Sequence, residues 1–498
     1  MKQLRKIAAL VLTCVMVFGM ASVVYATGTG TTPSGTTETG KITINNAIQG
    51  QTYTIYRILE LESYDATAGH YAYKPATTEW KSFLEDSGST YVTMDGEYVT
   101  WKTGADVAEF AKKALQYAKG NHVSNDYKTA ATTSVEFTGL PLGYYLVDSS
   151  VGALCSLNTT KPNATIEEKN GVPAVEKTVQ EDSTNNYGES NTADIGQTVN
   201  FRTTITAQAG AENYVLHDKM DAGLTFDGSV EVTITKKTTS ETSTVVATDY
   251  TLQKPVAPAT ALTDGCTFEL SFNQAFCDTL AKDDVITVSY SAILNEKAAI
   301  AGEGNKNETW LSYGDANKTI HKMTTTKTYS ISVFKYENSE DHTKTGLANA
   351  EFTISKKNND SMEPINLVKT SDTSASEATY RVAMKTEASG IKKVTIITTP
   401  ATGKFKIEGL DADTYYLTET KQPAGYNKLA APVRVTIDKD GNVTMGESSD
   451  PVNQVEIENK TGSLLPSTGG RGTTLFYILG GILVLGSAVI LITKRRMK

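Results

Sequence analysis

The sequence predicts an all-β protein of three tandem β-sandwich domains, with a short helix inserted in the first. Apolar and polar residues alternate with a period of two in many short segments, and Gly, Asn and Asp separate these segments, a pattern typical of antiparallel sandwiches. The chain has 498 residues, which at roughly 150 residues per domain corresponds to about three domains. We expect the N-terminal domain at 41–170, the middle domain at 171–325 and the C-terminal domain at 326–460.

The elements follow from the spacing of the apolar residues. The segment Ala105–Lys119 has them at helical spacing, with Asp106 near its start and Gly120 just past its end, so it predicts the inserted helix. Alternation predicts strands at 43–44 leading into 53–56, and at 199–205, 230–234, 284–290, 331–335 and 433–437.

Composition excludes several classes of protein. A content of 39% hydrophobic and 21% charged residues is that of a folded chain rather than a disordered one. A net charge of −9 argues against nucleic acid as a partner. Five His and four Cys leave little material for a His/Cys metal site, so we expect no metal and no cofactor. Nothing in the sequence resembles a catalytic triad or paired acids in a cleft.

The amino-terminal end has the features of a secretory signal peptide. Basic residues in Met1–Lys6 precede the apolar run Ile7–Val24, and small residues at Val24 and Ala26 suit a cleavage site. We therefore expect 1–26 to be removed and prefer this to a membrane anchor. Residues 27–40 are rich in Thr and Gly and predict a flexible leader.

The carboxyl-terminal segment 461–498 has a second apolar span. Leu475–Ile492 is just long enough to cross a bilayer, and the basic residues of Lys494–Lys498 would hold its end in the cytoplasm. The pentapeptide Leu465-Pro466-Ser467-Thr468-Gly469 comes directly before it. This arrangement resembles the cell-wall sorting signal of Gram-positive surface proteins. The resemblance implies that a partner enzyme, sortase, cleaves between Thr468 and Gly469 and passes the Thr468 carbonyl to an amine.

A short repeat links the first and last domains. Phe137–Asp148 and Ile407–Thr418 both contain Gly-Leu followed by Tyr-Tyr-Leu and an acid. With an offset of one residue, Asp148 and Glu419 take corresponding positions. We therefore expect the two domains to be sandwiches of the same type.

Several ionisable or amide residues lie on apolar strand faces. In Ala174–Gln180, Lys177 shares a face with Val175 and Val179, so it points into a core. The same alternation places further polar residues inward: Asp218, Lys335, Glu419, Asn459 and, less clearly, Asn307.

Such a set of residues could exchange an amide. A buried ammonium tends to lose its proton, and a neutral lysine is a nucleophile, whereas a buried carboxyl can hold a proton. Beside an Asn carboxamide, these groups could form an isopeptide bond and release ammonia. On alternation alone, a buried ion pair or a lysine that extends to solvent is the simpler explanation.

A family resemblance favours the isopeptide bonds. Tyr415–Tyr426 resembles the E-box of Gram-positive pilins, Leu347–Phe352 resembles the start of a Cna-B-type domain, and Val455–Lys460 resembles its last strand. The resemblance implies immunoglobulin-like, Cna-type sandwiches with bonds between the first and last strands. The implied bonds are Lys335–Asn459 with Glu419 as catalyst in the C-terminal domain, and Lys177–Asn307 with Asp218 as catalyst in the middle domain. The first domain departs from the pattern because Ile42–Asn45 has no inward lysine, so we expect no bond there.

The same family needs an exposed lysine that receives the neighbouring subunit. Its motif, Pro-Lys-Asn, lies shortly before the middle domain's bonding lysine. Lys169 has this distance from Lys177, although Glu168 replaces the proline. Lys169 also shares a polar strand face with the residues two and four positions earlier. Lys161, before Pro162, is the second candidate.

Three cysteines, Cys155, Cys266 and Cys277, would survive processing. Because an odd number cannot all pair within the chain, we expect free, buried thiols.

The sequence therefore predicts a structural subunit of a covalently polymerised pilus shaft on a Gram-positive cell wall, with no enzymatic activity beyond its own cross-linking. The implied partners are sortase, identical subunits and peptidoglycan, and the family adds minor pilins and host surface ligands. The alternative is a monomeric, wall-anchored adhesin.

Overall fold

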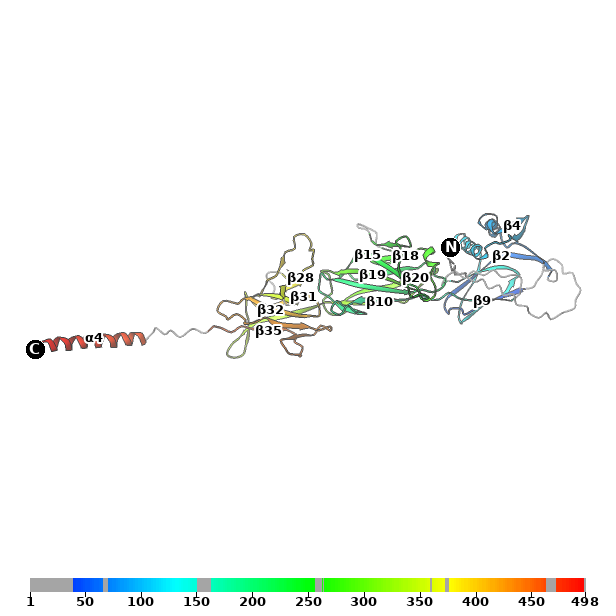
Figure 1. The fold of residues 1–498 in the computed structure, drawn as a ribbon. Helices are drawn as coiled ribbons and strands as arrows, with labels where there is room; N and C mark the ends of the chain where they lie inside the picture. The colour runs from blue at the N-terminus through cyan, green and yellow to red at the C-terminus, as the bar shows by residue number, and fades with distance from the viewer. Residues whose placement is uncertain are drawn as a thin grey trace. The chain divides into compact units, whose positions relative to one another are not determined.

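The computed structural model describes residues 39–65, 70–149, 163–255, 262, 264–358, 361–371, 376–462 and 472–496. Strands dominate these residues, as predicted, and the chain divides into two units, Met1–Thr328 and Tyr329–Lys498 (Figure 1). The expected signal peptide, most of the leader, Cys155, Lys161 and the pentapeptide lie outside the described residues.

The first part of the Met1–Thr328 unit has two main sheets and a helical insertion. One sheet has the order β7-β1-β9, and the other has β3-β2-β6 with β8 also paired to β2. Apolar residues of both sheets, among them Ile44, Tyr53, Phe137 and Val147, form their shared core. The strands are β1 (Thr39–Asn45), β2 (Thr52–Asp65), β3 (His70–Pro75), β4 (Val92–Asp95), β5 (Tyr98–Trp101), β6 (Asp126–Thr129), β7 (Ser134–Pro141), β8 (Gly143–Ser149) and β9 (Asn163–Glu167).

The inserted helix is confirmed, and a second one accompanies it. α2 (Val107–Gly120) begins where the Asp106 side chain accepts a hydrogen bond from Glu109 N at 3.0 Å. The additional helix α1 (Thr78–Glu85) is capped by Thr77 and buries Trp80. A short 3-10 turn, η1 (Ser87–Thr90), follows it.

The second part of this unit is a sandwich of two larger sheets. Their orders are β11-β10-β13-β19-β15-β16 and β12-β22-β20-β14-β18-β17, with β21 paired to β20. The elements are β10 (Ala174–Gln180), β11 (Tyr187–Gly188), β12 (Ser190–Thr192), β13 (Thr198–Thr206), β14 (Val215–Met220), β15 (Leu224–Thr235), β16 (Thr242–Thr244), β17 (Tyr250–Gln253), β18 (Phe268–Phe272), α3 (Gln274–Cys277), β19 (Val285–Leu294), β20 (Asn305–Tyr313), β21 (Asn317–Lys318) and β22 (Lys322–Lys327).

The Tyr329–Lys498 unit also contains two sheets. One has the order β24-β23-β31-β28-β27-β29 with β35 paired to β23, and the other has β26-β25-β32-β33-β34 with β30 paired to β25. The strands are β23 (Tyr329–Asn338), β24 (Lys344–Gly346), β25 (Glu351–Asn358), β26 (Ser361–Pro364), β27 (Leu367–Lys369), β28 (Ala378–Val382), β29 (Lys393–Val394), β30 (Ile397–Thr398), β31 (Lys404–Leu410), β32 (Thr414–Lys421), β33 (Val433–Ile437), β34 (Val443–Met445) and β35 (Val455–Glu458).

The chain ends in a long apolar helix, α4 (Gly472–Arg496). Its stretch Phe476–Arg496 has a mean hydropathy of 2.3 and is long enough to cross a membrane. The helix thus covers the predicted apolar span and the start of the basic tail.

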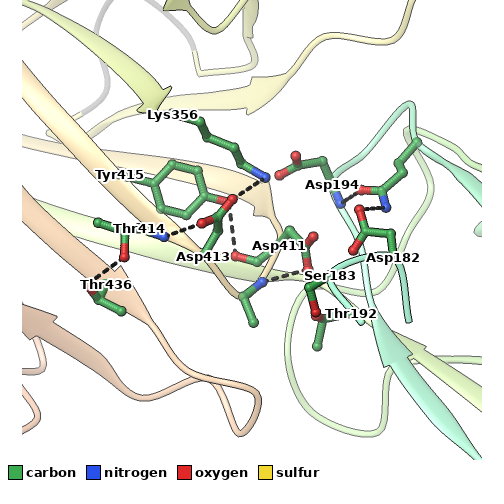
Figure 2. A network of polar contacts seen from close by, with 12 residues as sticks. Asp182, Ser183, Thr192, Asp194, Lys356, Asp411, Asp413, Thr414, Tyr415 and Thr436 are labelled. Atoms are coloured by element: carbon green, nitrogen blue, oxygen red, sulfur yellow. Dashed lines mark hydrogen bonds and ion pairs between the residues drawn. The ribbon is translucent and has the colours of Figure 1, made fainter. Parts of the chain in front are cut away.

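A tyrosine corner fixes the correspondence between the first and last domains. The Tyr415 hydroxyl donates to the Asp411 carbonyl at 2.9 Å (Figure 2), and the Tyr145 hydroxyl donates to the Pro141 carbonyl at 2.6 Å. The two segments therefore align without an offset, and Ser149 corresponds to Glu419. The expected match of Asp148 with Glu419 is wrong, because the one-residue offset pairs Tyr144 with Tyr415, whereas the two hydrogen bonds show that Tyr145 corresponds to Tyr415.

Asp148 lies on the opposite face of β8, toward α2. It is buried, and its carboxylate contacts Lys119 Nζ of α2 at 3.0 Å. Burial raises the pKa of Asp148 to about 7, against the opposing effect of Lys119. Asp148 is thus a partner of the inserted helix rather than of the sandwich core.

Candidate functional site

The C-terminal domain brings its three predicted residues together. Lys335 lies on β23, Asn459 directly follows the neighbouring strand β35, and Glu419 lies on β32 of the other sheet. Lys335 Nζ contacts Asn459 Oδ1. Asn459 Nδ2 donates to Glu419 Oε1 at 3.0 Å, and Lys335 Nζ lies 3.4 Å from the same oxygen. The amine, the carboxamide and the acid therefore form one contiguous cluster.

This cluster is shielded from solvent. The side chains of Lys335 and Glu419 are 0% exposed, and the Phe352 ring lies 5.8 Å from Lys335 Nζ. Burial lowers the pKa of Lys335, against the opposing effect of Glu419. Leu429 N donates to the second oxygen of Glu419 at 2.8 Å, which fixes the orientation of the carboxyl group.

The middle domain builds a similar cluster from strands of both its sheets. Lys177 on β10 lies 2.6 Å from Asp218 Oδ2 on β14. The hydroxyl of Tyr290, on β19, contacts both of these groups and accepts a hydrogen bond from Asn307 Nδ2 at 3.4 Å. Tyr290 thus connects the three predicted residues.

Both charged residues of this cluster are fully buried. Burial lowers the pKa of Lys177 and raises the pKa of Asp218, and their mutual attraction opposes both shifts. Each shift favours the uncharged form of its residue. Among the described residues, Asp218 Oδ1 and Asn307 Oδ1 have no hydrogen-bond partner. One carboxyl oxygen of Asp218 and the side-chain carbonyl of Asn307 therefore lack hydrogen bonds in the same core.

Two features of the middle cluster differ from expectation. Tyr290 was not predicted; the signal that could have found it is the alternation of 284–290, which puts Tyr290 on the same face as the buried Ile286 and Val288. Asn307 lies on β20, and β21 and β22 follow it within the same sandwich. The expectation that the linked residues come from the first and last strands therefore holds only for β23 and β35 of the C-terminal domain. In the middle domain, Lys177 and Asn307 lie on strands of different sheets.

The geometry of both clusters suits amide exchange. In such an exchange, a proton would pass from the lysine ammonium to the carboxylate, and the neutral amine would attack Asn Cγ. The protonated acid would supply a proton to the leaving nitrogen and take one from the attacking nitrogen, so that one amide bond would form, one would break and one ammonia would leave. In the C-terminal cluster the amine contacts the carboxamide, whereas in the middle cluster both groups contact the Tyr290 hydroxyl, and such proximity in a closed core favours a reaction of this kind.

The first domain has other residues at the equivalent positions. Glu168 N donates to the Asn45 carbonyl, as Asn459 N donates to the Tyr336 carbonyl. Glu168 therefore takes the place of Asn459, and Ile44 takes the place of Lys335, so this position has no amine. Burial raises the pKa of Glu168, whose carboxyl also interacts with Ser149 and Tyr53.

Glu168 also positions the candidate linking lysine. Its Oε1 accepts a hydrogen bond from Asn170 N at 2.8 Å. Asn170 packs so closely on Gly210 that a Cβ there would lie 1.9 Å from Asn170 Oδ1. Lys169, between two anchored residues, is exposed. It lies beyond the end of β9 at Glu167, so the expectation that it shares a strand face is wrong. Glu168 stands where the family motif has proline. Its buried carboxyl group thus holds the backbone in place beside an exposed amine.

Two of the cysteines behave as expected. Cys266 and Cys277 are free and buried, which confirms the prediction for these two.

Two families match the end of the chain. Residues 332–449 match the SpaA family, a prealbumin-like fold domain, and residues 457–498 match the LPXTG cell wall anchor motif. The recognition of the pentapeptide, apolar span and basic tail as a wall anchor is therefore confirmed. The protein is attached to a Gram-positive cell wall.

A solved structure extends the likeness to most of the chain. The T6 backbone pilin of serotype M6 Streptococcus pyogenes is similar over 82% of this chain and 81% of its own, with a TM-score of 0.51 and 17% identity. At this identity the likeness shows the fold alone, so most of this chain is folded like that protein. A curated relative, fimbrial subunit type 1 of Actinomyces viscosus, is 35% identical over 96 residues, which are 19% of this chain and 17% of the relative.

Proposed function

We propose that this protein is the shaft subunit of a covalently polymerised pilus. Sortase would break the Thr468–Gly469 bond and hold the Thr468 carbonyl as a thioester. The amine of Lys169 in another subunit would then attack this carbonyl, form an amide and release the enzyme's cysteine. In the last subunit, the Thr468 carbonyl would be transferred to peptidoglycan instead of to another subunit.

The observation that carries this proposal is the contrast among three lysines. Lys177 and Lys335 are 4% and 0% exposed, so they face their own cores. Lys169 is exposed and lies in the short connection between β9 and β10, where buried Glu168 braces the backbone. An amine that attacks an enzyme-bound carbonyl must protrude, and Lys169 does.

We also propose that each cluster forms its isopeptide bond without an enzyme. The bonds would be Lys177–Asn307, promoted by Asp218, and Lys335–Asn459, promoted by Glu419. Burial favours the uncharged lysine in both clusters. The attack is also supported by the contact of Lys335 Nζ with Asn459 and by the Tyr290 hydroxyl, which contacts both Lys177 and Asn307.

The position of the linking lysine gives these bonds a mechanical role. In a polymer joined from Lys169 to Thr468, tension enters each subunit at Lys169 and leaves at Thr468. It therefore runs through the middle and C-terminal domains and bypasses the residues before Lys169. This load path accounts for a first domain in which Ile44 takes the place of a bonding lysine.

Immunoblots of wall extracts test the proposal. The unmodified protein should give a ladder of high-mass species. Lys169→Ala and Lys169→Arg should both abolish the ladder, because a guanidinium is a poor nucleophile at neutral pH, while the monomer keeps its internal bonds.

Lys161→Ala is the matched control and should leave the ladder in place. Loss of the ladder in Lys161→Ala alone would assign the linkage to Lys161. A single band from the unmodified protein would favour the adhesin.

A further inference from the structure

Four metal-binding side chains converge on the middle domain, outside the cluster of Lys177. His217 lies on β14 and Glu269 on β18, while Asp264 and Cys266 lie in the segment that leads into β18. One ligand atom of each lies within 4.8 Å of the others. His217 and Asp218 are neighbours on one strand, so their side chains point to opposite faces.

The distances suit a single ion. Measured from His217 Nδ1, Asp264 Oδ2 lies at 2.7 Å, Glu269 Oε1 at 3.4 Å and Cys266 Sγ at 3.9 Å. A tetrahedral zinc ion with bonds of about 2.0–2.3 Å separates its ligands by roughly 3.3–3.8 Å. Two of the three distances are close to this range, and the third needs a modest rotation of Asp264, whose side chain is 24% exposed.

The imidazole of His217 is held in a suitable orientation. Its Nε2 lies 2.9 Å from Ser312 Oγ, and its ring stacks on Trp310 with centroids 5.0 Å apart and planes within 4°. When Nε2 donates its proton to Ser312, the lone pair of Nδ1 points toward the other three side chains. An outer hydrogen bond of this kind is typical of metal-binding histidines.

An ordinary ion pair explains this arrangement less well. A protonated His217 has one N–H at Nδ1 and can satisfy one acceptor, yet the carboxylates of both Asp264 and Glu269 lie within 3.4 Å of that atom. Cys266 is 4% exposed and the Glu269 side chain 16%, so solvent gives these groups little compensation. One cation with four open positions would satisfy all of them.

We propose that His217, Asp264, Cys266 and Glu269 bind one divalent transition-metal ion, with Zn²⁺ as the preferred ion. A thiolate and an imidazole favour zinc over calcium or magnesium, which take oxygen ligands. Cys266 binds as a thiolate, so its proton leaves to the buffer when the metal enters. The ion would tie β14 to the segment before β18.

No motif in the sequence points to this site. His217 and Cys266 are 49 positions apart, and the scattered His and Cys led us to expect no metal. Pairing of β14 with β18, which sets His217 opposite Glu269, brings the residues together.

Cobalt titration of the untagged, reduced full chain in detergent tests the proposal. We expect one Co²⁺ per chain, with a thiolate-to-cobalt band in the near ultraviolet that Zn²⁺ displaces. Cys266→Ser should abolish the band, and Asp264→Asn should weaken binding roughly tenfold or more.

The matched controls are Cys277→Ser and Cys155→Ser, which should keep the band. Circular dichroism of each variant verifies that it is folded. The proposal is overturned if the unmodified chain shows no saturable thiolate band at micromolar metal. It is equally overturned if folded Cys266→Ser keeps the band.

Discussion

Glu419→Gln separates the proposed chemistry of the C-terminal domain from its packing. The carboxamide has the same shape as the carboxyl and can still accept the hydrogen bond from Leu429 N. It cannot take up the proton that Lys335 must lose. We therefore expect a folded domain in which the Lys335–Asn459 bond does not form, so the chain keeps one more ammonia than the unmodified protein.

The cost to stability follows from the length of chain that the bond closes. Lys335 and Asn459 are 124 positions apart. By analogy with disulfides, a cross-link over such a loop lowers the entropy of the unfolded state and thereby raises the free energy of unfolding by about 5 kcal/mol at 25 °C. For a domain of the length of Tyr329–Gly462, this corresponds to a melting temperature lower by roughly 15–20 °C. An unpaired Lys335 in the core would add to the loss.

Differential scanning calorimetry of the full chain measures this change. Glu456→Gln is the matched control, because Glu456 is an exposed residue of β35 whose ion pair with Lys344 spans 2.5 Å. Glu456→Gln should lower the unfolding free energy by about 1 kcal/mol or less, and the variant should still lose the ammonia that accompanies the Lys335–Asn459 bond. The assigned role of Glu419 is incorrect if Glu419→Gln has the same melting temperature as the control, or if it loses the ammonia as the unmodified protein does.

Two further predictions concern the other domains. Tyr290→Phe removes the hydroxyl that contacts Lys177 and Asp218, so the middle bond should form about 10–100 times more slowly once the newly synthesised chain has folded. Time-resolved mass spectrometry of freshly synthesised chains would show an unchanged rate if Tyr290 only packs. Burial raises the pKa of Glu168, so the folded state holds this proton more tightly than the unfolded state. Its contribution to stability is present below the unfolded value of about 4.3 and is lost as the pH rises through the raised value. Glu168→Gln should therefore make the unfolding free energy decrease less steeply with pH above about pH 4. Denaturant titrations at several pH values measure this dependence, and the same dependence on pH in the variant and the unmodified protein would contradict this reasoning.

Alternation was sufficient to predict the inward residues, because each face of a strand is decided by local spacing. Ala174–Gln180 and 433–437 are strands with those bounds. Lys177, Asp218, Lys335 and Glu419 are all buried. The spacing of apolar residues also predicted α2, which has a capping aspartate and three helical turns of apolar residues.

Features that depend on strand pairing could not be read from the sequence. In the sequence, nothing distinguishes Tyr290 from other inward residues. Its contact with Lys177 depends on how β10, β14 and β19 are arranged. The role of Glu168 needed the tyrosine corners at Tyr145 and Tyr415, which set the true register of the repeat. α1 was missed because its apolar residues span only two turns.

The most direct test of the central claim is the intact mass of the folded, mature chain. The account predicts a mass lower than that of the sequence by two ammonia molecules. Peptide mapping should find Lys177 joined to Asn307 and Lys335 joined to Asn459. The unmodified mass would contradict the account.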